Sequence, residues 1–444
     1  MTETRKLFFT CAMAILAGGT TAFGQSADAL INKLLEKGIL NVKEANELRE
    51  ETDKNFSAAY SEKSGMPEWV TALKFTGDLR LRYDGIYSDV PGLVDRHRAR
   101  FRLRYGVVAS LAEDFEVGFR LASTASTGGN SAGDPVSTNE TFGNNANRKP
   151  IGIDLAFVRW SPIETPDWTG SFSVGKFENP FSFSEMLFDN DYTPEGLAQT
   201  LGYRINEDHQ MRFSLGQFIL DEIGTSSRDA YMFGAQTRLN SRWDEHWQSS
   251  LTFGALSILN PRTLTSAAVP DVNRGNTRTA AGVLVHDYNL LIADAAVTYT
   301  FDSAPFYKGK FPVRLGGEYI YNLGAPNKNV AFGFGPTFGK AGKRGTWEFS
   351  AKYKEMQADS VYEETVDSDY GAFYFRNPPY DSPGGFPTYS AGTNVRGPVF
   401  RFSYSPFDFL TLSTMYAITE LIDEVPPGSP SDGSKFIFDA VFRF

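Results

Sequence analysis

The fold is decided by the last ten residues, Lys435-Phe436-Ile437-Phe438-Asp439-Ala440-Val441-Phe442-Arg443-Phe444. Side chains of an extended strand alternate between two faces, so the aromatic residues share one face and Asp439 and Arg443 lie on the other. In an outer-membrane barrel, an apolar face meets lipid and a polar face lines the lumen. Because lipid does not tolerate an open strand edge, this strand must pair with the first and close a ring. The alternative is an ordinary strand of a soluble sandwich.

The same alternation recurs from Lys74 onwards and predicts about 16 strands. They cover residues 74–84, 96–111, 114–123, 151–162, 168–176, 196–206, 209–220, 230–240, 246–259, 290–302, 311–322, 331–340, 345–357, 395–406, 408–419 and 434–444. Their connections include short turns at 112–113, 207–208, 241–245, 341–344 and 406–407, and long polar loops at 124–150, 177–195, 260–289 and 358–394. Short periplasmic turns and long outer loops are typical of outer-membrane barrels. The predicted fold is therefore all-β, a transmembrane antiparallel β-barrel of about 16 strands with a short N-terminal helical segment.

The chain divides into three predicted parts. Residues 1–24 have the positive start, apolar core and small-residue end of a signal peptide, which predicts secretion through the inner membrane and cleavage before Gln25. Residues 25–66 form a periplasmic helical segment and linker, and residues 67–444 form the barrel. The helical pattern spans residues 26–63, which are expected to pack in an oligomer, on the barrel rim or on a periplasmic partner. The alternative is a poorly ordered tail.

Charge and cysteine content exclude several classes of function. The formal net charge of −10 argues against a general nucleic-acid-binding role. The single cysteine, Cys11, lies in the predicted signal peptide, so the mature chain would have no disulfide and no thiolate metal site.

Seven arginines on three consecutive predicted strands form what we call the arginine ladder. Its members are Arg80, Arg82, Arg98, Arg100, Arg102, Arg104 and Arg120. An arginine facing lipid at mid-bilayer costs ~2–4 kcal/mol, so this face must look onto a water-filled lumen. The ladder either tunes the pore or merely stiffens its wall by pairing with acids such as Glu116 and Asp154.

The loop after the fifth predicted strand is both acidic and apolar. Its carboxylates are Glu178, Glu185, Asp189, Asp191 and Glu195, and Phe181, Phe183 and Met186 are among its apolar residues. Folding into the lumen would bury the apolar side chains and place the carboxylates over the hole, so we expect a constriction loop. The alternative is an outward surface loop. The acidic loop 358–394, by contrast, is interpreted as a solvated face. Its spacing matches no tight cation loop, so neither a metal site nor a cofactor is predicted.

The segment Gly175-Lys176-Phe177-Glu178-Asn179-Pro180-Phe181, followed by Asp189-Asn190-Asp191 and Thr193-Pro194-Glu195-Gly196, resembles a family of putative porins of Gram-negative bacteria. The barrel pattern is also similar to general trimeric outer-membrane porins, and the closing strand with its terminal Phe resembles those of outer-membrane proteins. The resemblance implies an outer-membrane channel, a third outer loop folded into the pore, a homotrimer, and contacts with lipid and lipopolysaccharide. The loop departs from the Pro-Glu-Phe-Gly-Gly pattern of general porins.

The resulting prediction is a porin that passes small hydrophilic solutes and ions by passive diffusion. One alternative is a substrate-selective channel, and another is a structural or adhesive barrel without conductance. An enzyme is not predicted, because the histidines His97, His209, His246 and His286 sit in no recognisable catalytic constellation.

Overall fold

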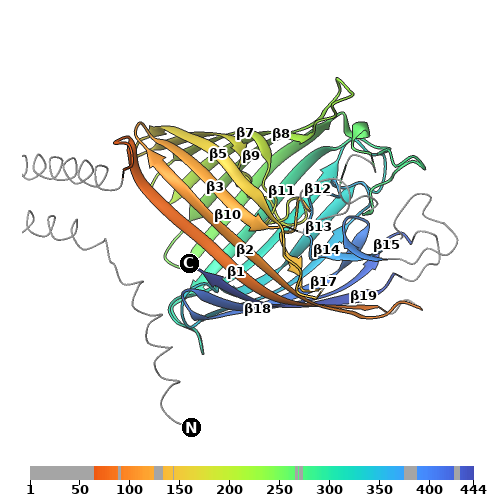
Figure 1. The fold of residues 1–444 in the computed structure, drawn as a ribbon. Helices are drawn as coiled ribbons and strands as arrows, with labels where there is room; N and C mark the ends of the chain where they lie inside the picture. The colour runs from red at the N-terminus through yellow and green to blue at the C-terminus, as the bar shows by residue number, and fades with distance from the viewer. Residues whose placement is uncertain are drawn as a thin grey trace, which may run out of the picture. The chain divides into compact units, whose positions relative to one another are not determined.

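Sixteen long antiparallel strands close into a barrel in the described residues of the computed structural model (Figure 1). The structure describes residues 65–88, 92–124, 134–143, 145–265, 269, 274–374, 388–424 and 431–444. The barrel strands are β1 (Val70–Ser88), β2 (Arg96–Leu111), β3 (Phe115–Ser123), β5 (Ile151–Glu164), β6 (Trp168–Lys176), β7 (Glu195–Arg204), β8 (His209–Asp221), β9 (Ala230–Arg242), β10 (Trp247–Leu259), β11 (Asn289–Phe301), β12 (Phe311–Asn322), β13 (Val330–Gly339), β14 (Thr346–Met356), β17 (Val395–Phe407), β18 (Leu410–Leu421) and β19 (Gly433–Arg443).

The last strand closes the ring against the first. β19 pairs antiparallel with β1, with Asp439 opposite Arg82 and Phe438 opposite Tyr83. Every other barrel strand pairs with its neighbour along the chain, apart from the intervening short elements. The predicted strand count and closure are therefore confirmed, and the predicted strand ends lie within a few residues of the observed ones.

The two faces of the strands differ as the alternation predicts. On β19, Phe438 is 40% exposed on the outside, whereas Ile437 is 2% exposed inside the barrel. Exposed aromatic side chains gather next to the short turns, where Trp168 stacks on Tyr203 with ring centroids 4.3 Å apart and Trp247 meets Tyr299 at 4.9 Å. An aromatic band next to one set of turns is the arrangement expected at a membrane interface.

Smaller elements lie in the long connections. β4 (Glu140–Thr141) pairs with β2, and β15 (Gly371–Tyr374) and β16 (Thr388–Ala391) form a hairpin of their own. A 3-10 turn, η1 (Pro261–Thr263), follows β10. The sequence did not predict these elements, because each is too short to show a period. None of the helical structure in the described residues is long and apolar enough to cross a membrane. The predicted signal peptide and the helical segment at residues 26–63 lie outside the described residues.

Candidate functional site

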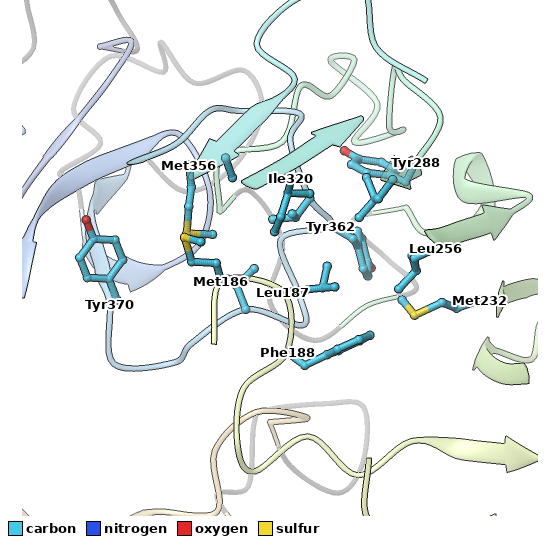
Figure 2. Close-up of a cluster of buried hydrophobic side chains, with 14 of the residues drawn as sticks. Met186, Leu187, Phe188, Met232, Leu256, Tyr288, Ile320, Met356, Tyr362 and Tyr370 are labelled. Carbon is cyan, nitrogen blue, oxygen red and sulfur yellow. The ribbon is translucent and has the colours of Figure 1, made fainter. Parts of the chain in front are cut away.

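The loop between β6 and β7, residues 177–194, folds into the barrel, and we call it the lumen loop. Met186, Leu187 and Phe188 are almost completely buried. Figure 2 shows these three side chains among Met232 of β9, Leu256 of β10 and other buried apolar side chains. The inward course expected of this loop is therefore observed, and the alternative of an outward surface loop is not, because that position would expose these apolar groups to bulk water.

Glycines on the inner wall make room for the lumen loop. A Cβ atom added to Gly234 on β9 would lie 2.6 Å from Cζ of Phe181, and one on Gly333 of β13 would lie 3.0 Å from Sδ of Met186. Gly216 on β8 and Gly254 on β10 face Phe181 and Phe183 in the same way. The loop side chains thus pack into recesses above these glycines, which we call the glycine sockets, and a residue with a Cβ atom would fill them.

Asp191 joins the lumen loop to the arginine ladder. Its carboxylate lies 2.8 Å from Arg102, 3.2 Å from Arg104 and 3.6 Å from Arg80. Burial raises the pKa of Asp191, but Arg102, Arg80 and Arg104 outweigh burial and hold it below its ordinary value. Asp191 is consequently a charged group that the ladder fixes inside the lumen.

The other predicted loop carboxylates take separate positions. Glu178 pairs with Arg120 of the ladder, and Glu185 reaches the other side of the barrel, 2.7 Å from Arg401 of β17. Asp189 accepts hydrogen bonds from the backbone N–H groups of Asp191 and Ser368 rather than binding the ladder. Glu195 is the first residue of β7 and pairs with Lys176 at 3.2 Å. These are the partners of the carboxylates named as the constriction.

Each arginine of the ladder has a carboxylate partner within 4.0 Å. Asp78 binds Arg102 and Arg104 at 2.7 and 2.6 Å. The remaining pairs are Arg80 with Asp191, Arg82 with Asp369 and Asp439, Arg98 and Arg100 with Asp84, and Arg120 with Asp154 and Glu178. Pairing with acids was the structural alternative for the ladder, and Asp154 is one of the acids it named. The other, Glu116, pairs with Arg159 instead.

The interpretation of loop 358–394 as a solvated acidic face is wrong for its described part. Asp359 and Glu363 have no exposed surface, and Asp367 is 7% exposed. Residues 357–370, which we call the second loop, fold inward and bind the lumen loop: the Asp189 N–H donates to the Thr365 carbonyl at 2.7 Å. These acids can be buried because cationic side chains inside the barrel pair with them, as Arg278 pairs with Glu363. Such partners lie far away in the sequence, so composition alone suggested solvent.

The pKa values of two carboxylates of the second loop are shifted in opposite directions. Burial raises the pKa of Asp369, but Arg82 and Lys435 outweigh it and hold that pKa well below its ordinary value. Burial raises the pKa of Asp367, and the nearby Glu185 raises it further, against the effect of Lys354 and Arg401. Asp369 therefore ties the second loop to β1 and β19 as a charged group.

Sequence reasoning missed a second set of inward cations, which we call the far wall: Arg212 on β8, Arg238 on β9, Arg314 on β12 and Lys352 on β14. Lys352 is the exception, because Lys352 and Lys354 lie opposite Trp347 and Tyr353 in the alternating pattern of β14. Arg212 and Arg314 are each the one arginine or lysine of their strand, which gives no ladder pattern. Counting alternate positions from the buried residues of each strand is the signal that would find them.

Three cavities border the lumen loop. One, of about 360 Å³, lies between residues 182–190 and the wall at Arg238, Arg314 and Lys352. The second, of about 540 Å³, is lined by Arg159, Arg212 and the loop stem at residues 177–180. The third, of about 320 Å³, lies beside residues 191–194 on the side of Asp154. The described residues contain no cluster of His, Cys, Asp and Glu side chains that could hold a metal ion.

Comparison with known proteins supports the family. Residues 92–257, which hold most of the arginine ladder and the whole lumen loop, match the family described as "Putative porin". This match agrees with the predicted resemblance to putative porins over that part of the chain. No curated protein matches the chain.

Solved structures with a similar chain trace include porins. A high-pH structure of Pseudomonas putida OprB has a TM-score of 0.48 at 11% identity, over 84% of this chain and 94% of that chain. A mutant of Rhodopseudomonas blastica porin has a TM-score of 0.41 at 10% identity, over 84% of this chain and 100% of that chain.

Proposed function

We propose that this protein forms a water-filled channel for passive diffusion of small hydrophilic solutes and ions. The match of residues 92–257 to the family described as putative porin supports this proposal. The observation that carries the proposal is the inner face of the barrel. Charged side chains line it, and two loops narrow it without covering the cavities beside the lumen loop. Charge on an inner surface is tolerated because it meets water.

We assign the constriction to the lumen loop and the arginine ladder. Asp191 faces three ladder arginines, so opposite charges meet within the lumen. Opposed charges across a narrow opening create a transverse field that orients dipolar solutes and separates the paths of cations and anions. The restriction in width comes from the loop itself, which the glycine sockets hold against β8, β9 and β10.

Planar-bilayer recording of the purified protein tests the channel. We expect stepwise ion conductance, and deletion of Ser182–Asp191 should raise the single-channel value. The matched control is deletion of Gly224–Ser226 in the exposed connection between β8 and β9, which should leave the conductance unchanged. A folded barrel that never conducts would refute the channel, and an unchanged conductance after the lumen-loop deletion would refute the constriction.

A substrate-selective channel is the second candidate, and one observation favours it. Both the lumen loop and the second loop enter the barrel and bind each other, so the opening is narrower than one loop would leave it. Saturable block of the ion current by one class of solute would support selectivity. Proportional permeation of all small solutes would support general diffusion.

The family and the barrel indicate an outer-membrane location and a channel rather than an enzyme. A homotrimer with contacts to lipid and lipopolysaccharide, and a periplasmic contact through residues 26–63, belong to the same proposal. Cleavage before Gln25 is checked by the mass of the mature N-terminal peptide. Cross-linking in native membranes, read by gel electrophoresis, tests the trimer.

A further inference from the structure

We propose that the far wall is a binding site for small anions inside the lumen, where inorganic phosphate and short carboxylates dwell as they cross. This inference rests on the proposed channel function and names the solute class that its lumen favours. The site is the cavity of about 360 Å³ between the lumen loop and the strands that carry Arg238, Arg314 and Lys352.

The cations of the far wall lack the partners that the ladder has. Within the described residues, no carboxylate lies within 4.0 Å of the nitrogen atoms of Arg212, Arg238, Arg314 or Lys352. Among the hydrogen bonds of the described residues, Arg238 donates to the Asn240 side chain at 3.1 Å, and Arg212 to the Pro180 carbonyl at 3.4 Å. Their charges therefore remain available to a ligand.

The carboxylates that line the same cavity are already engaged. Glu185 binds Arg401 at 2.7 Å and Lys354 at 3.4 Å. Glu318 accepts hydrogen bonds from the N–H and the hydroxyl of Ser184. Asp294 accepts a hydrogen bond from Thr252 at 3.4 Å. In the described part of the chain, Asp294 is thus the one acid beside the cavity without an N–H donor or a cation, whereas Arg238, Arg314 and Lys352 supply three positive charges.

The wall beside these cations is recessed. Gly316 on β12 and Gly333 and Gly335 on β13 line the cavity with no side chain of their own. Glycine keeps the backbone close here, since a Cβ on Gly316 would lie 3.5 Å from Cζ of Arg314, and Met186 already lies over Gly333. A cavity of this volume admits an anion the size of phosphate together with water, since a water molecule takes about 30 Å³ of liquid.

The far wall continues toward the short turns as a row of cations. Arg212 lies directly opposite Arg238 in the β8–β9 register. Arg212 also lines the cavity of about 540 Å³ with Arg159, so arginine side chains line both cavities. Guanidinium groups bind phosphate and carboxylate through paired N–H donors. A row of such groups offers an anion several successive binding sites, so the anion can move from one to the next and leave the lumen.

Planar-bilayer recording in a potassium chloride gradient tests the site, with inorganic phosphate as the probe. We expect a reversal potential that reports selectivity for chloride over potassium, and we expect phosphate to inhibit the chloride current. Arg314→Gln and Lys352→Gln should each move the reversal potential toward potassium and weaken phosphate inhibition about tenfold, the loss expected for a charged hydrogen bond. Arg314→Lys should retain most of the selectivity for chloride and most of the phosphate inhibition.

The control is Arg242→Gln. Arg242 lies at the exposed end of β9, where it pairs with Asp208, so the variant should change neither the reversal potential nor the phosphate inhibition. If the wild-type channel conducts but both far-wall variants keep its reversal potential and its phosphate inhibition, the anion site is refuted while the channel stands. If the wild-type protein does not conduct at all, the proposed function fails as well. Equal shifts in Arg242→Gln would also overturn the site, because they would show that net charge alone sets selectivity.

Discussion

The arginine ladder and the far wall belong to the same lumen, half a ring of strands apart, but their partners differ. Each ladder arginine has an aspartate or glutamate within 4.0 Å, whereas Arg238, Arg314 and Lys352 have none in the described residues. The ladder is the conspicuous feature of the sequence, with four arginines on β2 alone. The comparison teaches that a dense row of one charge inside a barrel is balanced by its neighbours, while isolated charges are left free.

The largest expected effect is on the free energy of unfolding, and it comes from replacing the buried aspartate that pairs with the ladder. Asp84, which has no exposed side-chain surface, pairs with Arg98 and Arg100. Asp84→Asn leaves both arginines without that partner and should lower the free energy of unfolding by ~3–5 kcal/mol. Urea unfolding of the barrel in lipid vesicles measures the loss.

The matched variant is Asp208→Asn, which breaks the exposed pair with Arg242 and should cost no more than ~1 kcal/mol. If Asp84→Asn and Asp208→Asn lower the free energy of unfolding equally, the ion pairs of the ladder are as solvated as the exposed pair. The contrast between a paired ladder and an unpaired far wall would then not hold.

The second prediction concerns the socket of the lumen loop. Gly234→Val puts a branched side chain where Phe181 now lies and should push the loop away from β9. Single-channel conductance should then rise toward the value of the loop deletion. Gly143→Ala is the control, because its Cβ would meet nothing within 4 Å. A conductance that stays at the wild-type value would mean that the loop does not depend on this socket.

The third prediction sharpens the charge balance of the ladder. Arg120→Gln combined with Asp154→Asn removes a neutral pair, so the net charge of the lumen does not change. Its reversal potential should stay within a few millivolts of wild type, in contrast to Arg314→Gln. A large shift toward potassium in the double variant would show that Arg120 acts as a free cation.

The smallest effect is expected from mild acid. The pKa values of Asp191 and Asp369 lie below their ordinary 3.8, so the stability that these groups add is present above that value and is lost as pH falls through their lowered pKa values. The stability that Asp191 adds, measured as the difference in the free energy of unfolding between wild type and Asp191→Asn, should therefore be the same at pH 7 and pH 5. A difference that shrinks at pH 5 would contradict the charged state of Asp191.

The strands could be predicted from sequence because period-2 alternation is a local property. β2, β6 and β12 begin and end at the predicted residues. The inward course of the lumen loop was predictable too, since Phe181 and Met186 are too apolar for an outer loop. The ion-pair partners were not: Glu185 meets Arg401 at a separation of 216 residues, and Arg82 meets Asp439 at 357.

The second loop shows where composition misleads. Asp359, Glu363 and Asp367 suggest solvent when they are counted as charges. Their burial depends on cations and backbone donors from elsewhere in the chain, such as Arg278 and the N–H of Thr277. A buried carboxylate is tolerated when it is paired and hydrogen-bonded, and that condition is fulfilled only in three dimensions.

The most direct test of a water-filled lumen uses two neighbouring residues of β11. Thr298 lies opposite Arg314 in the strand register and faces inward, whereas Val297 is exposed on the outer face. A water-soluble thiol reagent should reduce the single-channel conductance of Thr298→Cys and leave that of Val297→Cys unchanged. Modification that lowers the current through the Val297 variant, or no effect at Thr298 in a folded barrel, would contradict an aqueous channel lined by this face.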